Sequence, residues 1–287
     1  MAARNIKGAG LGLRPLHLHE VLQEQPDVPW FEVHICNYLG GGLNPFLLSQ
    51  INEIYPLSFH GVSLNLGGVD VLDFDYLSDL KKAINTYQPV LVSEHACFTA
   101  HDGHFFHDLL PVPFTDEAVQ YMANRIKVVQ DFLGRQILIE NVSRYATYAE
   151  SQLSEGEFLA AVSREADCGL LLDLNNAYVN QHNLGESVDT FLLEIPVERV
   201  AEIHLAGYFV KEDRLLDTHS AEVTHEVWEV FEKYCEQCPM VPCLIEWDSK
   251  LPSFDVLMSQ MRKAQAYMDF RAYQPTAEGQ SCLVMPV

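Results

Sequence analysis

Eight short apolar segments recur along the chain, and each gap between them is long enough for a helix. They lie at residues 10–14, 31–35, 57–64, 89–95, 136–141, 169–175, 200–207 and 242–248. Apolar strands that alternate with helical stretches are typical of parallel α/β folds. Eight such units in about 250 residues are the size of a (β/α)8 barrel. The sequence therefore predicts an α/β fold of the TIM-barrel type.

Helix start signals between the apolar segments support this prediction. Thr115 precedes a segment in which apolar residues recur at helical spacing from Val119 to Leu133. Ser154 and Glu157 form a capping-box pattern before the next helical segment. A doubly wound open sheet is the main alternative, but no GxGxxG motif follows the first strand.

Length and charge limit the organisation and the partners of the chain. We expect one barrel domain at residues 1–270 and a C-terminal tail at 271–287. The net charge of −22, from 18 basic and 40 acidic residues, argues against nucleic acid or an anionic membrane as partner. The N-terminal residues lack the apolar core of a signal peptide, and no apolar run could span a bilayer. A cytoplasmic location is the expectation.

The seven cysteines are expected to be mostly reduced, because their number is odd and no secretory signal precedes them. Cys235, Cys238 and Cys243 resemble part of a zinc site. A structural zinc ion usually takes four ligands, so this cluster is a weak candidate.

Metal-capable side chains end six successive strand candidates, from the third to the eighth. In a barrel, these strand ends form the face that carries the catalytic residues. Solvated strand ends would explain any one of them but explain six in a row poorly. They are His60, Glu94, His95, Glu140, Asn141, Asp173, Asn175, Asn176, His204, Glu246 and Asp248.

Asp217 and His219 follow the seventh strand candidate and would join this set if the chain turned back over His204. Imidazole and carboxylate ligands without thiolate suit iron, manganese or zinc in sites that stay open to substrate. So many carboxylates would repel one another unless cations lay between them. The pattern therefore predicts more than one metal ion.

Nine ordered motifs resemble those of the multinuclear non-haem iron-dependent oxidative enzymes, a family that includes the oxidase of methanobactin biosynthesis. The resemblance runs from about residue 8 to residue 260 and implies a xylose-isomerase-like barrel. The motifs are "FEVHICNY", "SFHGVSLNLGG", "SEH", "DLLPVPFT", "LIENVSRY", "GLLLDLNNAYV", "EIHLAG", "DTHS" and "LIEWD".

The resemblance implies a set of metal ligands. Glu140 is the expected bridging carboxylate, and Glu140 and His204 are the expected catalytic residues. Asn175 and Asn176 are adjacent, and which of the two is a ligand stays open. Glu32, His34, Asn141, Asn175 and Asp248 are expected to support the ligands or to contact the substrate. The ligand set is His60, His95, Glu140, Asp173, Asn176, His204, Asp217, His219 and Glu246.

The resemblance also implies an activity. Members use two or three iron ions, in mixed ferrous and ferric states, and dioxygen to modify cysteines of ribosomally synthesised precursor peptides. A separate partner protein often recognises the precursor. Zinc or manganese can take the same ligands in an isolated protein.

Three positions depart from the family pattern and bear on the substrate rather than on the metals. Cys36 replaces a glutamate, "EHACF" replaces the more usual "EHLxW", and Tyr208 stands where histidine is common. After the fourth strand, a segment with three histidines at 101, 104 and 107 could cover the substrate, or be an ordinary exposed loop.

Three alternatives stay open. A divalent-metal sugar isomerase or epimerase would need no dioxygen, and no lysine falls at a strand end to assist it. A metal-dependent phosphodiesterase acting on DNA would need a basic groove, which the net charge opposes. A metal-storing or scaffold protein would have a closed site.

Overall fold

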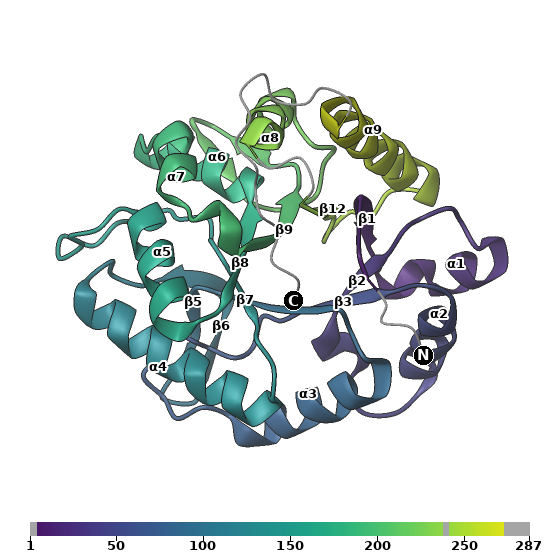
Figure 1. Ribbon diagram of the computed structural model, residues 1–287, viewed down its shortest axis with the longest axis horizontal. Helices are drawn as coiled ribbons and strands as arrows, with labels where there is room; N and C mark the ends of the chain where they lie inside the picture. Colours follow the sequence, from purple (N-terminus) through teal and green to yellow (C-terminus); the bar gives the residue numbers. More distant parts are fainter. Residues whose placement is uncertain (1–4, 238–240, 273–287) are drawn as a thin grey trace.

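The chain forms a closed barrel of parallel strands surrounded by helices, as Figure 1 shows in a view down the barrel. The computed structural model describes residues 5–237 and 241–272. The strand order around the barrel is β1-β12-β9-β8-β7-β4-β3-β2, and every neighbouring pair is parallel. The predicted TIM barrel is confirmed.

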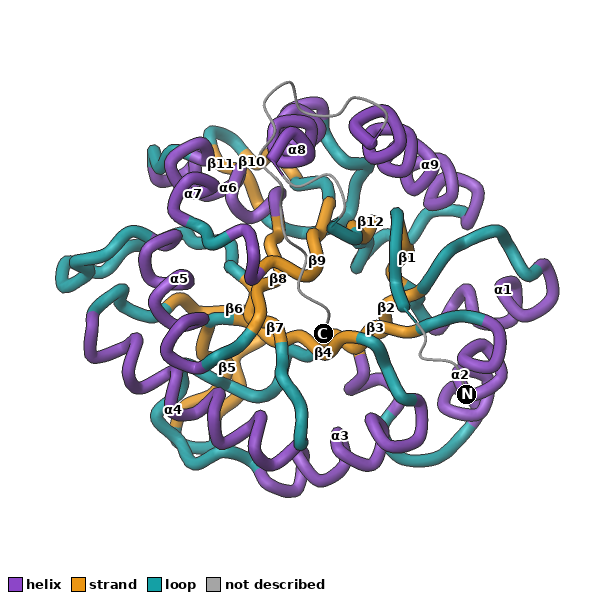
Figure 2. Tube along the Cα trace, in the orientation of Figure 1, coloured by secondary structure: helices purple, strands orange, loops and turns teal. Residues whose placement is uncertain are grey.

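All eight predicted strands lie in the barrel wall, coloured orange in Figure 2. Their interiors are almost entirely buried; Leu170, Leu171 and Leu172, for example, are 0% exposed. Strands covered on both faces read as continuous apolar runs, which explains why the sequence predicts them. The barrel strands are β1 (Ala9–Gly12), β2 (Phe31–His34), β3 (Leu57–His60), β4 (Leu91–His95), β7 (Leu138–Glu140), β8 (Gly169–Asp173), β9 (Val200–Leu205) and β12 (Cys243–Ile245).

Helices form the outer ring, with their apolar faces on the barrel. Thr115 caps α4 by accepting a hydrogen bond from the Ala118 amide (3.1 Å), and Ser154 and Glu157 form the predicted capping box of α5. The α-helices are α1 (Leu18–Glu24), α2 (Leu43–Ile54), α3 (Phe74–Tyr87), α4 (Asp116–Leu133), α5 (Glu155–Ala166), α6 (Leu174–Leu184), α7 (Val188–Glu194), α8 (His225–Gln237) and α9 (Phe254–Ala272); η1 (Pro15–His17), η2 (Ile35–Tyr38) and η3 (Val197–Arg199) are 3-10 helices.

Two antiparallel hairpins that the sequence reading missed are inserted after barrel strands. The first pairs β5 (Cys97–His101) with β6 (His104–Pro111) and follows β4. The second pairs β10 (Phe209–Lys211) with β11 (Arg214–Leu216) and follows β9. Both follow the carboxyl ends of barrel strands, where a barrel enzyme builds its site.

The remaining expectations concern the chain ends and the cysteines. Helix α9 ends at Ala272, and the rest of the predicted tail lies outside the described residues, as does Cys238. Cys235 and Cys243 are buried, and no group of metal-capable side chains found in residues 5–237 and 241–272 contains a cysteine. Over the same residues, no helix is both long and apolar enough to cross a membrane.

Candidate metal centre

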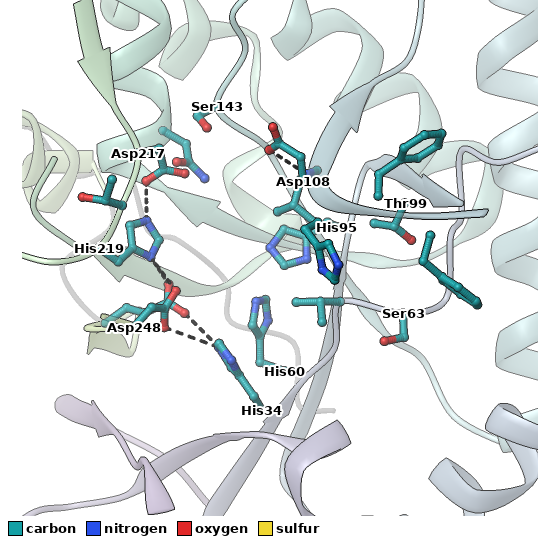
Figure 3. A pocket seen from close by; sticks show the side chains of 18 of the residues that line it. His34, His60, Ser63, His95, Thr99, Asp108, Ser143, Asp217, His219 and Asp248 are labelled. Carbon is teal, nitrogen blue, oxygen red and sulfur yellow. Dashed lines mark hydrogen bonds and ion pairs between the residues drawn. The ribbon is translucent and has the colours of Figure 1, made fainter. Parts of the chain in front are cut away.

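The carboxyl ends of the barrel strands surround a cavity of about 430 Å³. Its wall contains His60 and His95 from the barrel strands and Asp217 and His219 from the segment after β11. Figure 3 shows these side chains converging on the same space. The structure thus places residues that are far apart in the sequence at one mouth of the barrel.

Glu140, at the end of β7, lies at the centre of the cluster and is 1% exposed. Its Oε2 atom is 3.3 Å from His60 Nε2 and 3.1 Å from His95 Nε2. Its Oε1 atom is 3.5 Å from His204 Nδ1. Oε2 has no hydrogen-bond partner within the described part of the chain. A buried carboxylate with candidate ligands near both of its oxygens could bind two ions.

A second group of metal-capable atoms shares Glu140 and reaches across the barrel. Glu140, Asp173, His204 and Glu246 each offer one ligand atom, and these atoms lie within 4.8 Å of one another. His204 Nδ1 is 3.0 Å from Glu246 Oε2, and Asp173 Oδ2 is buried without a hydrogen-bond partner in the described residues. Three carboxylates and an imidazole at this spacing match the ligand chemistry of iron, manganese or zinc.

His219 forms the third corner, together with Asp217. His219 Nε2 is 2.7 Å from Asp217 Oδ1 and 3.6 Å from Asp173 Oδ2, while its Nδ1 is 3.1 Å from Glu246 Oε2. The backbone of His219 has φ 41°, a left-handed conformation that is uncommon for a non-glycine residue and is concentrated at functional sites. The same oxygen of Glu246, Oε2, therefore lies close to both His204 and His219.

Two amide side chains after β8 have different roles. The Asn175 amide donates to Asp217 Oδ1 (2.9 Å). The Asn176 amide instead donates to the Asn141 carbonyl (3.1 Å), and Asn176 lines the cavity. The Oδ1 atoms of both are buried without a hydrogen-bond partner in the described chain. Asn141 also exchanges two 2.9 Å hydrogen bonds with the Asp173 backbone and so fixes the end of β8.

The histidines of the cluster are oriented by further groups that the sequence reading did not single out. His60 Nδ1 is 2.7 Å from Ser93 Oγ, and His95 Nδ1 is 3.0 Å from the Gly61 carbonyl. A metal-bound histidine is usually held in this way through its other ring nitrogen. In both residues it is therefore Nε2 that faces Glu140.

Glu32 and Glu202 lie on the side of His204 that faces away from the cavity, and both are 0% exposed. Glu32 Oε1 is 3.2 Å from His204 Nε2, and Glu202 Oε1 is 3.9 Å from it. The Ser58 hydroxyl lies within hydrogen-bond distance of both glutamates, 3.3 Å from Glu32 Oε2 and 3.2 Å from Glu202 Oε2. Burial, followed by the neighbouring Glu32 carboxylate, raises the pKa of Glu202 well above its usual value.

His34 and Asp248 lie at the outer edge of the cluster. His34 Nε2 is 3.2 Å from Glu246 Oε1, and Asp248 Oδ2 is 3.3 Å from His219 Nδ1. Both line the cavity. Each contacts an expected ligand, and their role in the site stays a prediction.

The ionisable groups of the site hold protons to different degrees. Burial disfavours the charged forms of His95, His204 and His219, but neighbouring carboxylates outweigh it and raise the pKa of each imidazole. Burial also raises the pKa of Asp173.

Burial lowers the pKa of His60 to about 4, which leaves a neutral imidazole at pH 7. Burial disfavours the charged form of Glu140, but the neighbouring histidines outweigh it and lower the pKa of this carboxyl. Neutral imidazoles and ionised carboxylates are the forms that bind metals. Metal binding would therefore release protons from His95, His204 and His219. The imidazole and carboxylate donors, with their buried atoms that lack hydrogen-bond partners in the described residues, fit metal ions.

The β5–β6 hairpin forms one wall of the cavity in place of the irregular loop that the sequence suggested. Its pairing shifts between Phe98 and Ala100, so the segment of β6 from Phe105 to Leu109 bulges toward the cavity and lines it. Phe105 is 76% exposed and Phe106 is 39% exposed. His107 lines the cavity, whereas His101 and His104 are exposed and lie outside its lining. Apolar rings at the rim offer a contact surface for a substrate.

Solved structures with the same architecture identify the fold. Endonuclease IV of Thermus thermophilus has a TM-score of 0.60 at 15% identity, covering 92% of this chain and 99% of its own. D-Psicose 3-epimerase of Clostridium cellulolyticum has a TM-score of 0.58 at 9% identity, and the match covers 93% of this chain and 99% of the epimerase. At these identities the likeness shows the fold alone. The fold and site define a xylose-isomerase-like TIM barrel with candidate metal ligands at its mouth.

Within this class, the chain belongs to the family of the RiPP precursor modification enzymes MbnB/TglH/ChrH, whose model matches residues 8–269. A UPF0276 protein of Acaryochloris marina is 47% identical over 268 residues, which are 93% of this chain and 97% of that protein. A UPF0276 protein of Chromobacterium violaceum is 41% identical over 259 residues, which are 90% of this chain and 94% of that protein. The resemblance seen in the sequence motifs is confirmed at the level of the family.

Proposed function

We propose that the chain is a multinuclear non-haem iron enzyme that uses dioxygen to oxidise a cysteine of a ribosomally synthesised precursor peptide. Membership in a family of precursor-modifying enzymes supports a peptide substrate. The observation that supports the metal part is the position of Glu140, whose Oε2 lies near His60 and His95 and whose Oε1 lies near His204. One carboxylate in that position can join two ions.

The proposed ligands divide among the three corners of the cluster. His60, His95 and Glu140 would hold one ion, and Glu140, Asp173, His204 and Glu246 would hold a second. His219 and Asp217, with an amide oxygen of Asn176, would hold a third. Six of these side chains line the cavity, whereas Glu140, Asp173 and His204 are buried outside its lining; the six are His60, His95, Asn176, Asp217, His219 and Glu246, and all but Asp217 are buried.

Bound iron would supply the electron transfer to dioxygen and would favour the thiolate form of a nearby cysteine. The electrons leave the cysteine, and dioxygen is the acceptor. The chain's own residues position the reactants: a cavity of about 430 Å³ admits a cysteine and its neighbours in a peptide. Hydroxyl groups of Ser63, Thr99 and Ser143 line its wall and can bind peptide amides.

The acidic surface bears on how the peptide arrives. A net charge of −22 repels an anionic precursor at long range. A basic precursor, or a separate protein that binds the precursor and the barrel together, would overcome this repulsion. We favour a partner protein.

Metal analysis of protein prepared without oxygen tests the proposal. We expect at least two iron ions per chain, and a Mössbauer spectrum with more than one iron environment. A single bound ion after iron reconstitution would contradict the multinuclear centre. Full activity with magnesium or manganese in the absence of dioxygen would favour an epimerase of the kind that shares the fold.

A further inference from the structure

Arg14 is a buried cation at the edge of the candidate metal centre, and no proposed ligand role involves it. It follows β1 and is 5% exposed. Its guanidinium contacts Asp248 Oδ1 closely, and Nη2 is 3.5 Å from Glu246 Oε1 and 3.2 Å from His34 Nε2. These three partners form the outer corner of the cluster.

The same outer corner could hold a metal ion by geometry alone. Ligand atoms of His34, His60 and Glu246 lie within 4.8 Å of one another, as do those of His219, Glu246 and Asp248. An ion in either group would share Glu246 with Arg14 and have His34 or Asp248 as its neighbour. Two positive charges at such close range repel each other strongly when both are buried.

Arginine is well suited to replace a metal ion here. Its guanidinium is charged at every physiological pH, and its Nη2 atom contacts the carboxylates of both Asp248 and Glu246. The backbone leaves space for the fork, because a Cβ atom at Gly12 would lie 3.1 Å from Arg14 Nη1. The permanent positive charge of Arg14 next to Asp248 can therefore neutralise this carboxylate as a bound cation would.

We propose that Arg14 takes the place of a metal ion in the outer corner and so limits metal binding to the inner side of the cluster. In this arrangement Arg14 engages Asp248 and Glu246 Oε1, which leaves Glu246 Oε2 directed at His204 (3.0 Å) and His219 (3.1 Å). Arg14 is a positioning residue that sets the number of ions, and Asp248 is its counter-ion rather than a ligand. The inference rests on the proposed metal centre but not on the oxidase chemistry.

Counting metal ions in matched variants tests this inference. Wild type, Arg14→Lys, Arg14→Gln, Asp248→Asn and the double variant Arg14→Gln/Asp248→Asn are loaded with ferrous iron without oxygen, and separately with zinc. Ions per chain are measured by mass spectrometry of the metals after removal of the excess. Circular dichroism checks that each variant is folded.

We expect Arg14→Gln to bind one ion more than wild type, because its outer corner has lost its cation. Arg14→Lys keeps the charge and should match wild type. The double variant identifies the ligands of the added ion: the wild-type count would assign it to His219, Glu246 and Asp248, and one ion more would assign it to His34, His60 and Glu246. An unchanged or lower count in folded Arg14→Gln would overturn the inference.

If Arg14→Gln does not fold, the Asp248→Asn variant tests whether Asp248 is a counter-ion of Arg14 or a metal ligand. Its count should equal that of wild type, since Asp248 binds Arg14 and not a metal. Loss of an ion from Asp248→Asn would show that Asp248 is a ligand and would overturn the inference. The wild-type count separately tests the metal centre itself, because fewer than two ions would contradict the proposed function whatever Arg14 does.

Discussion

His204 and Glu32 face each other inside the barrel, with His204 Nε2 3.2 Å from Glu32 Oε1 and both side chains inaccessible to solvent. The other ring nitrogen of His204 lies 3.0 Å from Glu246 Oε2 in the candidate metal centre. A histidine that binds a metal through Nδ1 carries its proton on Nε2, and Glu32 is the carboxylate within reach of it. An ionised Glu32 at this distance would favour the ring form of His204 with its proton on Nε2, and so would leave Nδ1 for a metal ion.

Replacing Glu32 by glutamine should weaken metal binding by roughly 10- to 100-fold, the usual effect of removing a carboxylate behind a metal-bound histidine. Titration against a chelator measures the affinity. Glu202→Gln is the matched control, because Glu202 lies at 3.9 Å from the same nitrogen and should have a smaller effect. Equal affinity in Glu32→Gln and wild type would refute this role.

Glu140→Gln should lose at least one metal ion while the barrel stays folded, because the amide has lost the charge that holds two cations together. Metal analysis gives the count, and circular dichroism gives the fold. Glu155→Gln provides a buried control, since Glu155 pairs with Arg144 away from the cavity and should leave the count unchanged. A full complement of ions in Glu140→Gln would remove its bridging role.

The two adjacent asparagines should respond differently to substitution. We expect Asn176→Ala to lower metal occupancy, because Asn176 lines the cavity and its buried Oδ1 has no hydrogen-bond partner in the described residues. Asn176→Asp should retain the ions, because a carboxylate can replace the amide oxygen as a ligand. Asn175→Ala should keep the occupancy closer to wild type, since its amide supports Asp217. The reverse order of effects would assign Asn175 as the ligand.

The rim of the β5–β6 hairpin should affect peptide binding and not stability. Phe105→Ser with Phe106→Ser should raise the KM for the peptide severalfold, while the thermal midpoint and the metal count stay unchanged because both rings are exposed. Val71→Ser is the control, because Val71 is an exposed apolar residue (87%) outside the cavity lining. An unchanged KM would exclude the hairpin from peptide binding.

The sequence predicted the barrel well for a physical reason. Parallel strands buried on both faces read as apolar runs, and each run ends where a polar side chain meets the cavity. His60, Glu140 and Asp173 are the last residues of their strands in the structure. Their convergence follows once the barrel closes.

Other features depend on contacts that no local pattern carries. The β5–β6 hairpin contains histidines, aromatic residues and a shifted pairing, so it lacks the regular alternation of an exposed strand. Glu32 and Glu202 lie on strands that are not neighbours, and only the closed barrel brings both to His204. Arg14 ends the first apolar segment, and its acidic partners Glu246 and Asp248 lie on the last apolar segment. In the sequence, a basic residue among acidic strand ends is the feature that could have indicated this contact.

The oxygen dependence of peptide modification tests the central claim most directly. Iron-loaded protein is mixed with a cysteine-containing precursor peptide and with its Cys→Ser counterpart, with and without dioxygen, and peptide masses are recorded over time. We expect a mass change only for the cysteine peptide and only when both iron and dioxygen are present. Modification that proceeds equally without dioxygen, or equally on the serine peptide, would contradict an iron-dependent cysteine oxidase.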